Sequence, residues 1–306
     1  MSWHRPFGTT IRDGWDVVVE PDASGWEHTG LYAAELGPGE TRALEARGRE
    51  LVVIPLNGSV SVSSEDSAGR HEATLSGRES VFAGPTDVAY VPPGSSVTVT
   101  AAGPARVAVA FAVAGKSAAS RSFRHVAVGD VPVELRGAGA ASREVRNFGI
   151  PGVLDADSII ACEVITPAGN WSSYPPHKHD EERPGEETQL EEIYYFEVRS
   201  THRSERDRTS GDPPADGGPG FVRVYGTRER PIDVLAEVRT GDVVLVPHGW
   251  HGPAMAAPGY DLYYLNVMAG PGPERAWRIC DDPDHAWVRD TWADQAIDPR
   301  LIGGQR

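Results

Sequence analysis

The sequence predicts an all-β protein made of many short strands. Its 306 residues include 34 glycines and 25 prolines, which fall between short apolar runs along the whole chain. Such punctuation is typical of strands joined by turns and does not suit long helices. The dipeptide Asn57-Gly58, set between two apolar runs, is favoured in tight β-hairpins. Regular short strands with turns of this kind indicate a sandwich or a small barrel.

The expected strands divide the chain into two halves. In the first half we expect strands at residues 17–19, 31–36, 50–56, 59–63, 71–75, 87–91, 96–101 and 106–112. In the second half we expect them at residues 122–133, 158–165, 192–197, 221–225, 233–238, 242–246 and 260–267. The small and polar residues 114–120 suggest a linker, and residues 200–220 have the composition of a low-complexity loop. We expect the tail from residue 273 to pack against a barrel or a second subunit.

The two halves contain similar segments. Residues 87–94 (DVAYVPPG) resemble residues 242–249 (DVVLVPHG), and both indicate a strand followed by a proline and a glycine turn. The copy in the first half has no histidine pair and no histidine after its glycine. We therefore predict a metal-free N-terminal domain at residues 1–130 and a metal-binding C-terminal domain at residues 131–306.

Charge and composition exclude several classes of partner. The formal net charge is −15 and the 29 lysines and arginines are scattered, so nucleic acid and anionic membranes are poor partners. Two cysteines, Cys162 and Cys280, do not make a disulfide framework. No apolar stretch approaches the roughly 18 residues of a membrane span, and residues 1–10 lack an apolar secretory core. We expect a cytoplasmic protein.

A candidate metal site stands out in the second half. His177 and His179 are two residues apart, so on a strand both side chains point to one face. Glu191 and Glu192 begin a later strand and face opposite ways. Either could be the metal ligand, and their alternation with aromatic residues does not show which one is. His251 follows the Pro-x-Gly turn. Imidazole and carboxylate ligands suit Zn, Mn, Fe, Co or Ni, and the lack of cysteine ligands argues against a closed structural zinc site.

These motifs resemble a known family. A His-x-His pair, a following glutamate and the stretch Gly-x5-Pro-x-Gly at residues 241–249 with a histidine just after it resemble the two motifs of the cupin barrel. The strings NWSSYPPHKHD at residues 170–180 and DLYYLNVMAG at residues 261–270 resemble the 5-deoxy-glucuronate isomerases of myo-inositol catabolism. The resemblance covers most of the chain and is strongest at residues 146–287.

The resemblance implies a fold and a ligand set. It implies two cupin jelly-roll barrels, a bicupin, of which the second is catalytic. It also implies that Glu192 rather than Glu191 joins His177, His179 and His251, because the cupin glutamate is followed two or three residues on by an aromatic strand residue. The expected cofactor is one divalent metal ion per chain, Zn or Mn in the first place and otherwise Fe, Co or Ni.

The implied activity is the aldose–ketose isomerisation of 5-deoxy-D-glucuronate to 5-dehydro-2-deoxy-D-gluconate. A sugar acid needs a cation for its carboxylate, and we expect Arg223 in this role because arginine can bind a carboxylate through two hydrogen bonds. Tyr174 and Tyr264 are candidate substrate-binding residues. Tyr194 and Asp261 are candidates for the general base.

Two other functions are compatible with the same residues. A cupin dioxygenase could use this ligand set with Fe(II), and a non-catalytic cupin could bind a sugar acid without turning it over. Oxygen consumption would distinguish the first, and ligand-induced stabilisation without turnover the second. We further expect a homodimer, because a sheet face left uncovered by one barrel must be buried by the other barrel or by a second chain.

Overall fold

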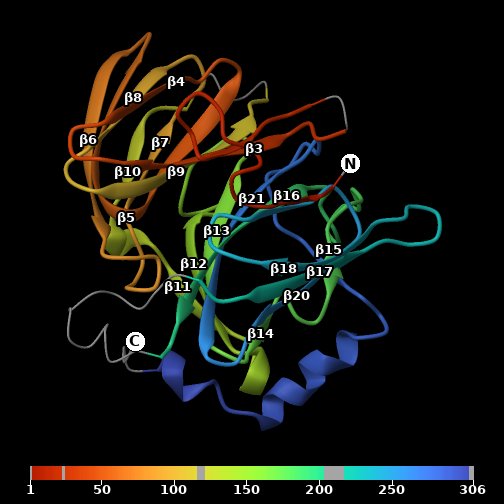
Figure 1. Ribbon diagram of the computed structural model, residues 1–306. Helices are drawn as coiled ribbons and strands as arrows, with labels where there is room; N and C mark the ends of the chain where they lie inside the picture. The colour runs from red at the N-terminus through yellow and green to blue at the C-terminus, as the bar shows by residue number, and fades with distance from the viewer. Residues whose placement is uncertain (1, 23–24, 116–120, 203–216, 303–306) are drawn as a thin grey trace.

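The computed structural model describes residues 2–22, 25–115, 121–202 and 217–302. As expected, the architecture is mostly β, and the helical segments are 3₁₀ helices (Figure 1). The expected linker at residues 114–120 and the expected loop at residues 200–220 lie largely outside the described residues. Within the described ranges, no helix has the length and apolar character needed to cross a membrane.

The first half forms a nine-stranded sheet with the main order β10-β7-β5-β9-β3-β2. Strands β4, β6 and β8 lie off this path. The long strand β5 pairs with β7 and β9 on the main path and also with β6 and β8. The strands are β2 (Val17–Val19), β3 (Thr29–Leu36), β4 (Thr41–Glu45), β5 (Arg49–Asp66), β6 (Gly69–Arg78), β7 (Val88–Val91), β8 (Ser96–Ala101), β9 (Ala105–Val113) and β10 (Arg124–Val126).

The second half contains a seven-stranded sheet, β1-β19-β16-β21-β13-β12-β11, and a six-stranded sheet, β18-β17-β20-β15-β22 with β14 beside β20. The first comprises β1 (His4–Arg5), β11 (Val133–Arg136), β12 (Arg143–Gly149), β13 (Ile160–Thr166), β16 (Glu191–Ser200), β19 (Val243–Val246) and β21 (Tyr260–Ala269). The second comprises β14 (Trp171–Ser172), β15 (His177–Lys178), β17 (Gly220–Tyr225), β18 (Asp233–Val238), β20 (Trp250–Ala256) and β22 (Cys280–Asp281). The 3₁₀ helices are η2 (Val128–Asp130), η3 (Gly139–Ala141), η4 (Ala286–Asp294) and η5 (Pro299–Leu301).

Three apolar clusters fill the molecule in layers. One lies within the first half and a second within the second half. The third joins the halves, because it contains Val52 and Tyr90 from the first together with Ile193 and Leu265 from the second. The large sheet of the second half is therefore apolar on both faces, since one face lines its own barrel and the other packs against the first half.

The nine-stranded sheet of the first half and the seven-stranded sheet of the second half have the same strand topology, and each contains one strand contributed from outside its own half. The order β10-β7-β5-β9-β3-β2 corresponds position by position to β1-β19-β16-β21-β13-β12. However, β1 from the start of the chain pairs with the second half, and β10, which follows the first half, pairs with the first. Each exchanged strand brings a histidine to an equivalent aspartate, His4 to Asp242 at 3.1 Å and His125 to Asp87 at 3.2 Å. The similarity of residues 87–94 and 242–249 thus reflects a real structural repeat.

Two buried glutamates add reciprocal links between the halves. Glu50, on β5, accepts hydrogen bonds from the backbone N–H groups of residues 157–159 in the second half, at 2.6–2.8 Å. Glu191, at the equivalent start of β16, accepts hydrogen bonds from the N–H groups of residues 27–29 in the first half, at 2.5–3.0 Å. Hydrogen bonds to a charged acceptor are stronger than neutral ones, so these two carboxylates help fix the halves together.

The hairpin expected at Asn57-Gly58 is wrong. Residues 49–66 form the single strand β5, and the pairing register shifts on both sides of Gly58. Gly58 has a φ of +73°, and a Cβ atom there would lie 2.5 Å from the carbonyl oxygen of Pro104. The glycine therefore allows a bulge where β5 passes from one group of partner strands to the other.

The single strand expected at residues 122–133 is also wrong. The chain forms β10, then the 3₁₀ helix η2, and β11 begins at Val133. The break is needed because β10 pairs with the first half and β11 with the second.

The C-terminal segment packs on this chain's own second half, where η4 runs along the bottom of the molecule (Figure 1). The homodimer stays a prediction.

Candidate metal centre

Three strands bring the predicted ligands together inside the second half. His177 lies on β15 and is the register partner of His251 on β20. Glu192 lies on β16, on the face that points into the barrel together with Tyr194. His251 follows the Pro-x-Gly turn, as expected, and is the second residue of β20. Strand pairing therefore fixes the relative positions of residues that are far apart in the sequence.

The four side chains form a compact buried cluster. The candidate ligand atoms of His177, His179 and His251 all lie within 4.8 Å of one another, and all three residues are buried. One carboxylate oxygen of Glu192 lies 3.1 Å from Nε2 of His179 and 3.1 Å from Nε2 of His251. This is the only such group of ligand-type side chains found among the described residues.

Backbone carbonyl groups set the tautomer of each histidine. The Nδ1 atom of His177 lies 3.4 Å from the oxygen of Pro175. For His179 the partner is the oxygen of Leu190 at 3.2 Å, and for His251 it is the oxygen of Gly249 at 3.2 Å. A carbonyl oxygen can only accept, so Nδ1 carries a proton in each ring, and Nε2 is the atom that would bind a metal ion.

The electrostatics of the cluster also fit a cation. Burial lowers the pKa of His177 well below its ordinary value, and the neighbouring imidazoles lower it further. Burial opposes ionisation of Glu192, yet its contacts with His179 and His251 outweigh burial and lower the pKa of this carboxyl to about 2. Burial likewise opposes charge on His179, but the hydrogen bond to Glu192 outweighs it and raises the pKa.

Among the described residues, Nε2 of His251 is one of several buried polar atoms without a hydrogen bond of acceptable geometry, although buried polar atoms normally have one. An anionic carboxylate beside three imidazole Nε2 atoms, one of them unpartnered, is a suitable donor set for a divalent cation. The residues present therefore fit a metal ion.

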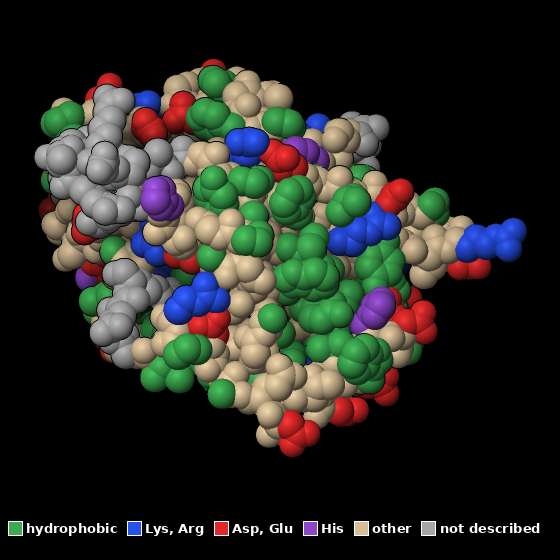
Figure 2. Space-filling view, turned by 60° about the horizontal axis from the view of Figure 1, so that its bottom comes forward, with side chains coloured by type: hydrophobic (Ala, Val, Ile, Leu, Met, Phe, Trp, Pro, Cys, Tyr) green, Lys and Arg blue, Asp and Glu red, His purple; other side chains and the backbone are tan. Residues whose placement is uncertain are grey.

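The cluster adjoins a cavity of about 440 Å³. His177 and Glu192 line it, together with the aromatic residues Tyr194, Tyr264 and Trp292. Arg289 and Trp292 of η4 also line the cavity, so the C-terminal segment closes part of it. Figure 2 shows that hydrophobic side chains gather on the bottom face of the molecule. The volume is suitable for one small ligand.

The structure brings two of the predicted tyrosines into this cavity. The hydroxyl groups of Tyr194 and Tyr264 lie 3.0 and 3.1 Å from Oγ of Ser173, so the three hydroxyls form a chain. Tyr174 does not line the cavity, and its ring packs edge-on against Trp171 with the centroids 5.2 Å apart.

Two other predicted residues lie away from the cavity. The guanidinium of Arg223 pairs with Asp233 and donates to two backbone carbonyl groups. The carboxylate of Asp261 accepts from the N–H of Ala168 at 3.0 Å and pairs with Arg199. Neither Arg223 nor Asp261 lines the cavity. In both cases the partners are on neighbouring strands or loops, as expected for residues that stabilise the barrel.

The cationic wall of the cavity was not predicted from the sequence. Arg136, Arg143 and Arg289 line it. Arg136 and Arg143 belong to β11 and β12, and β12 was not among the expected strands. Arg289 lies in the C-terminal helix η4. A correct assignment of the strand at residues 143–149 would have placed Arg143 on the inner face with Val145. The tail from residue 273 was expected to pack against a barrel or a second subunit, but no sequence signal indicated that Arg289 lines the cavity.

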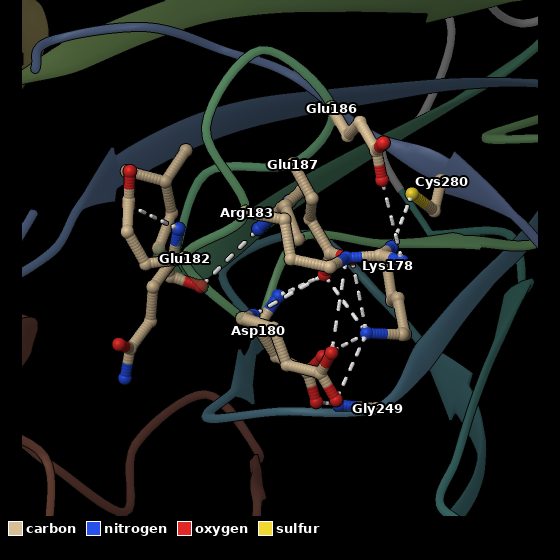
Figure 3. Close-up of polar contacts among 12 residues, drawn as sticks. Lys178, Asp180, Glu182, Arg183, Glu186, Glu187, Gly249 and Cys280 are labelled. Atoms are coloured by element: carbon tan, nitrogen blue, oxygen red, sulfur yellow. Dashed lines mark hydrogen bonds and ion pairs between the residues drawn. The ribbon is translucent and has the colours of Figure 1, made fainter.

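A polar network on the opposite face of β15 ties the ligand-bearing segments together (Figure 3). Lys178, between the two histidines, pairs with Asp180 at 2.7 Å and with the buried Glu187 at 2.9 Å. Asp180 also accepts a hydrogen bond from the N–H of Gly249 at 2.9 Å. Gly249 in turn holds Nδ1 of His251 through its carbonyl oxygen. The network therefore joins the His-x-His segment to the loop that precedes the third histidine.

Removing Asp180 should loosen this link. In an Asp180→Ala variant we expect metal affinity to fall by about tenfold, as for other residues that orient metal ligands, while the protein stays folded. The matched control is Glu186→Ala, because Glu186 is an exposed residue of the same loop. Competition with a chelator measures the affinity. Equal affinities in the two variants would show that Asp180 does not position the site.

Comparisons with known proteins agree with this architecture. The KduI/IolB family model matches residues 4–288. A protein of Geobacillus kaustophilus named 5-deoxy-glucuronate isomerase is 40% identical over 289 residues, which cover 94% of this chain and 95% of that protein. The crystal structure of an IolB-like protein from Salmonella typhimurium superimposes with a TM-score of 0.80 at 34% identity, covering 94% of this chain and 99% of that one.

A more distant structure shows the fold alone. Oxalate decarboxylase of Lactobacillus farciminis has a TM-score of 0.56 at 12% identity, covering 84% of this chain and 80% of that one. Fold and site together thus define a cupin-like β protein with a buried His/Glu cluster beside a polar cavity. The chain belongs to the KduI/IolB family, and it is an isomerase.

Proposed function

We propose that this protein converts 5-deoxy-D-glucuronate to 5-dehydro-2-deoxy-D-gluconate in myo-inositol catabolism. The name carried by its relatives supports the substrate. The observation that carries the proposal is the buried His/Glu cluster at the wall of a cavity large enough for one sugar acid and lined by cationic and hydroxyl groups. An aldose–ketose isomerase needs these features to hold a small polar substrate and to exchange protons with it.

The proposed cofactor is one divalent metal ion per chain, held by His177, His179, Glu192 and His251. Zn or Mn suits these ligands best, and Fe, Co or Ni is also compatible. Such an ion would act as a Lewis acid that stabilises the negative charge developing on the substrate oxygens. No other cluster of ligands occurs in the described residues, which supports a metal-free first half and a catalytic second half in a bicupin arrangement.

The remaining chemistry falls to side chains of the cavity. Isomerisation removes a proton from the carbon that bears the hydroxyl and returns one to the former aldehyde carbon. Tyr194 is our candidate for this proton transfer, because it lines the cavity and its hydroxyl joins the chain formed with Ser173 and Tyr264. A general acid or base must first be within hydrogen-bond reach of the reacting group. Asp261 does not meet this condition.

Turnover in D₂O followed by NMR tests the proposal. With metal-loaded protein we expect 5-deoxy-D-glucuronate to give the ketose, with deuterium at the new hydroxymethyl carbon because the transferred proton exchanges with solvent. Full retention of protium there would indicate an internal hydride shift instead. A metal-loaded protein that leaves this substrate unchanged would refute the isomerase substrate. Oxygen consumption would then point to a dioxygenase, and stabilisation without turnover to a binding protein.

A further inference from the structure

The three arginines of the cavity wall differ in their partners. Arg136 pairs with Glu134 at 2.8 Å, and Arg289 pairs with Asp281 at 2.7 Å. Arg143 forms no ion pair with any residue that the structure describes. It is nevertheless buried, with an exposed fraction of 8%. The cavity wall therefore has a buried positive charge that makes no direct ion pair with a carboxylate of the described residues, although Glu134 lines the same cavity.

Neighbouring groups hold the Arg143 guanidinium in place but accept hydrogen bonds from only part of its N–H groups. One terminal nitrogen donates to the oxygen of Ala141 at 3.0 Å and more weakly to that of Tyr174 at 3.5 Å. The guanidinium also lies against Trp292, with its central carbon 5.5 Å from the ring centroid. These are its hydrogen bonds and ring contacts within the described ranges. A guanidinium has five N–H donors, so most of them are left for a ligand.

Burying a charge without an ion-pair partner is costly. Burial lowers the pKa of Arg143 to about 10, so that the group is still charged at neutral pH. A protein that keeps such a group at the wall of a cavity is well suited to bind an anion there, because the anion supplies the missing charge. A planar guanidinium matches a carboxylate in particular, through two parallel hydrogen bonds.

Strand geometry places this cation on the same surface as the metal centre. Arg143 and Val145 alternate inward on β12, and Val145 pairs with Val164 on β13. Val164 pairs with Tyr264 on β21. Glu192 and Tyr194 line the same cavity from β16. Arg143 therefore lines the same cavity as His177 and Glu192, so one ligand there can contact both.

We infer that Arg143 binds the carboxylate of the substrate and so selects sugar acids over neutral sugars. The identity of the sugar rests on the proposed function, whereas the selection of a carboxylate rests on Arg143 itself. Holding the carboxylate sets the register of the substrate, because it fixes which carbon atoms reach the metal centre. This role replaces the one expected for Arg223, whose guanidinium pairs with Asp233 outside the cavity.

Binding of two non-reactive probes tests the inference directly. D-Gluconate and D-glucitol have the same carbon chain, but only gluconate carries a carboxylate. Calorimetry on the metal-loaded protein should show that the wild type prefers gluconate by at least about 30-fold, the lower range for a buried charge pair. Arg143→Met should lose this preference while its weaker affinity for glucitol stays unchanged. Arg143→Lys should keep part of it.

Controls separate recognition from folding. Arg223→Met removes an arginine outside the cavity and should keep the wild-type preference. Metal content and thermal unfolding of each variant show whether the site is intact, and Arg143→Lys carries the test if the methionine variant does not fold. Added methylguanidinium should partly restore gluconate binding to Arg143→Met, a rescue that a purely structural role would not give.

Several results would overturn the inference. A wild type that binds both probes equally has no carboxylate site. A preference for gluconate that survives in Arg143→Met would place the carboxylate elsewhere, for example on the metal ion. Failure of the proposed function looks different, since a wild type that prefers gluconate but does not turn over 5-deoxy-D-glucuronate would refute the substrate and leave the role of Arg143 standing.

Discussion

Replacing Glu192 with glutamine should release the metal ion and lower turnover by about a thousandfold or more, the loss expected when a Lewis acid is removed from a reaction of this type. The carboxylate is the only anion in contact with the histidine cluster among the described residues, 3.1 Å from both His179 and His251. A neutral amide of the same size keeps the shape but removes the charge. Elemental analysis of the purified variant and NMR of its turnover measure the two effects.

Glu191→Gln provides the matched control, because it is the adjacent residue on the same strand. Glu191 points the other way and accepts hydrogen bonds from the N–H groups of residues 27–29. We expect this variant to keep its metal and to lose about 1–3 kcal/mol of stability, since an amide cannot accept all these bonds. Loss of metal from Glu191→Gln with retention in Glu192→Gln would exchange the roles of the two residues.

The ambiguity between these two glutamates has a structural cause. In a sheet with one buried face, alternation of polar and apolar residues shows which side points inward. Strand β16 is buried on both faces, because Tyr194 belongs to the core of the barrel and Ile193 to the core between the halves. The sequence pattern around Glu191 and Glu192 therefore has no polar face. Only the cupin motif indicated Glu192.

Local signals predicted the mostly β architecture, the repeat and the histidines, because short strands, Pro-Gly turns and a His-x-His pair are visible within a few residues. They failed where the chain depends on distant partners. Asn57-Gly58 has the composition of a hairpin turn, yet β5 continues through it because partner strands lie on both sides. Arg143 and Arg223 look alike in sequence, and only tertiary structure shows that Arg223 has a carboxylate partner while Arg143 faces the cavity.

The largest loss of stability is expected for Glu163→Gln. This fully buried carboxylate on β13 pairs with Arg78 from the first half, with one nitrogen–oxygen distance of 2.9 Å, and accepts from the hydroxyl of Tyr263 at 2.7 Å. Arg146 lies 3.7 Å away. Removing the anion leaves the buried cation of Arg78 uncompensated, so we expect a loss of about 3–5 kcal/mol in the free energy of unfolding. Urea denaturation measures it.

A surface pair serves as the control for this variant. Glu237 pairs with Arg239 near the end of β18, and both side chains are about half exposed. Exposed ion pairs contribute about 0–1 kcal/mol, so Glu237→Gln should hardly change the denaturation midpoint. Similar losses in Glu163→Gln and Glu237→Gln would mean that burial of the Arg78–Glu163 pair is not what ties the halves together.

The pH dependence of stability tests whether the charge of Glu163 causes the stability loss in Glu163→Gln. Burial opposes ionisation of this carboxyl, but the charge and hydrogen bonds of Arg78, with Arg146 and Tyr263, outweigh burial and lower the pKa below the ordinary value of 4.5. A lowered pKa in the folded state stabilises the protein above the unfolded pKa, and this contribution is lost as the pH falls through the folded value. The stability difference between wild type and Glu163→Gln should therefore be constant between about pH 6 and 8 and should shrink below about pH 4.5. A difference that stays the same down to pH 3 would show that shape or hydrogen bonding, rather than the charge of Glu163, holds the two halves together.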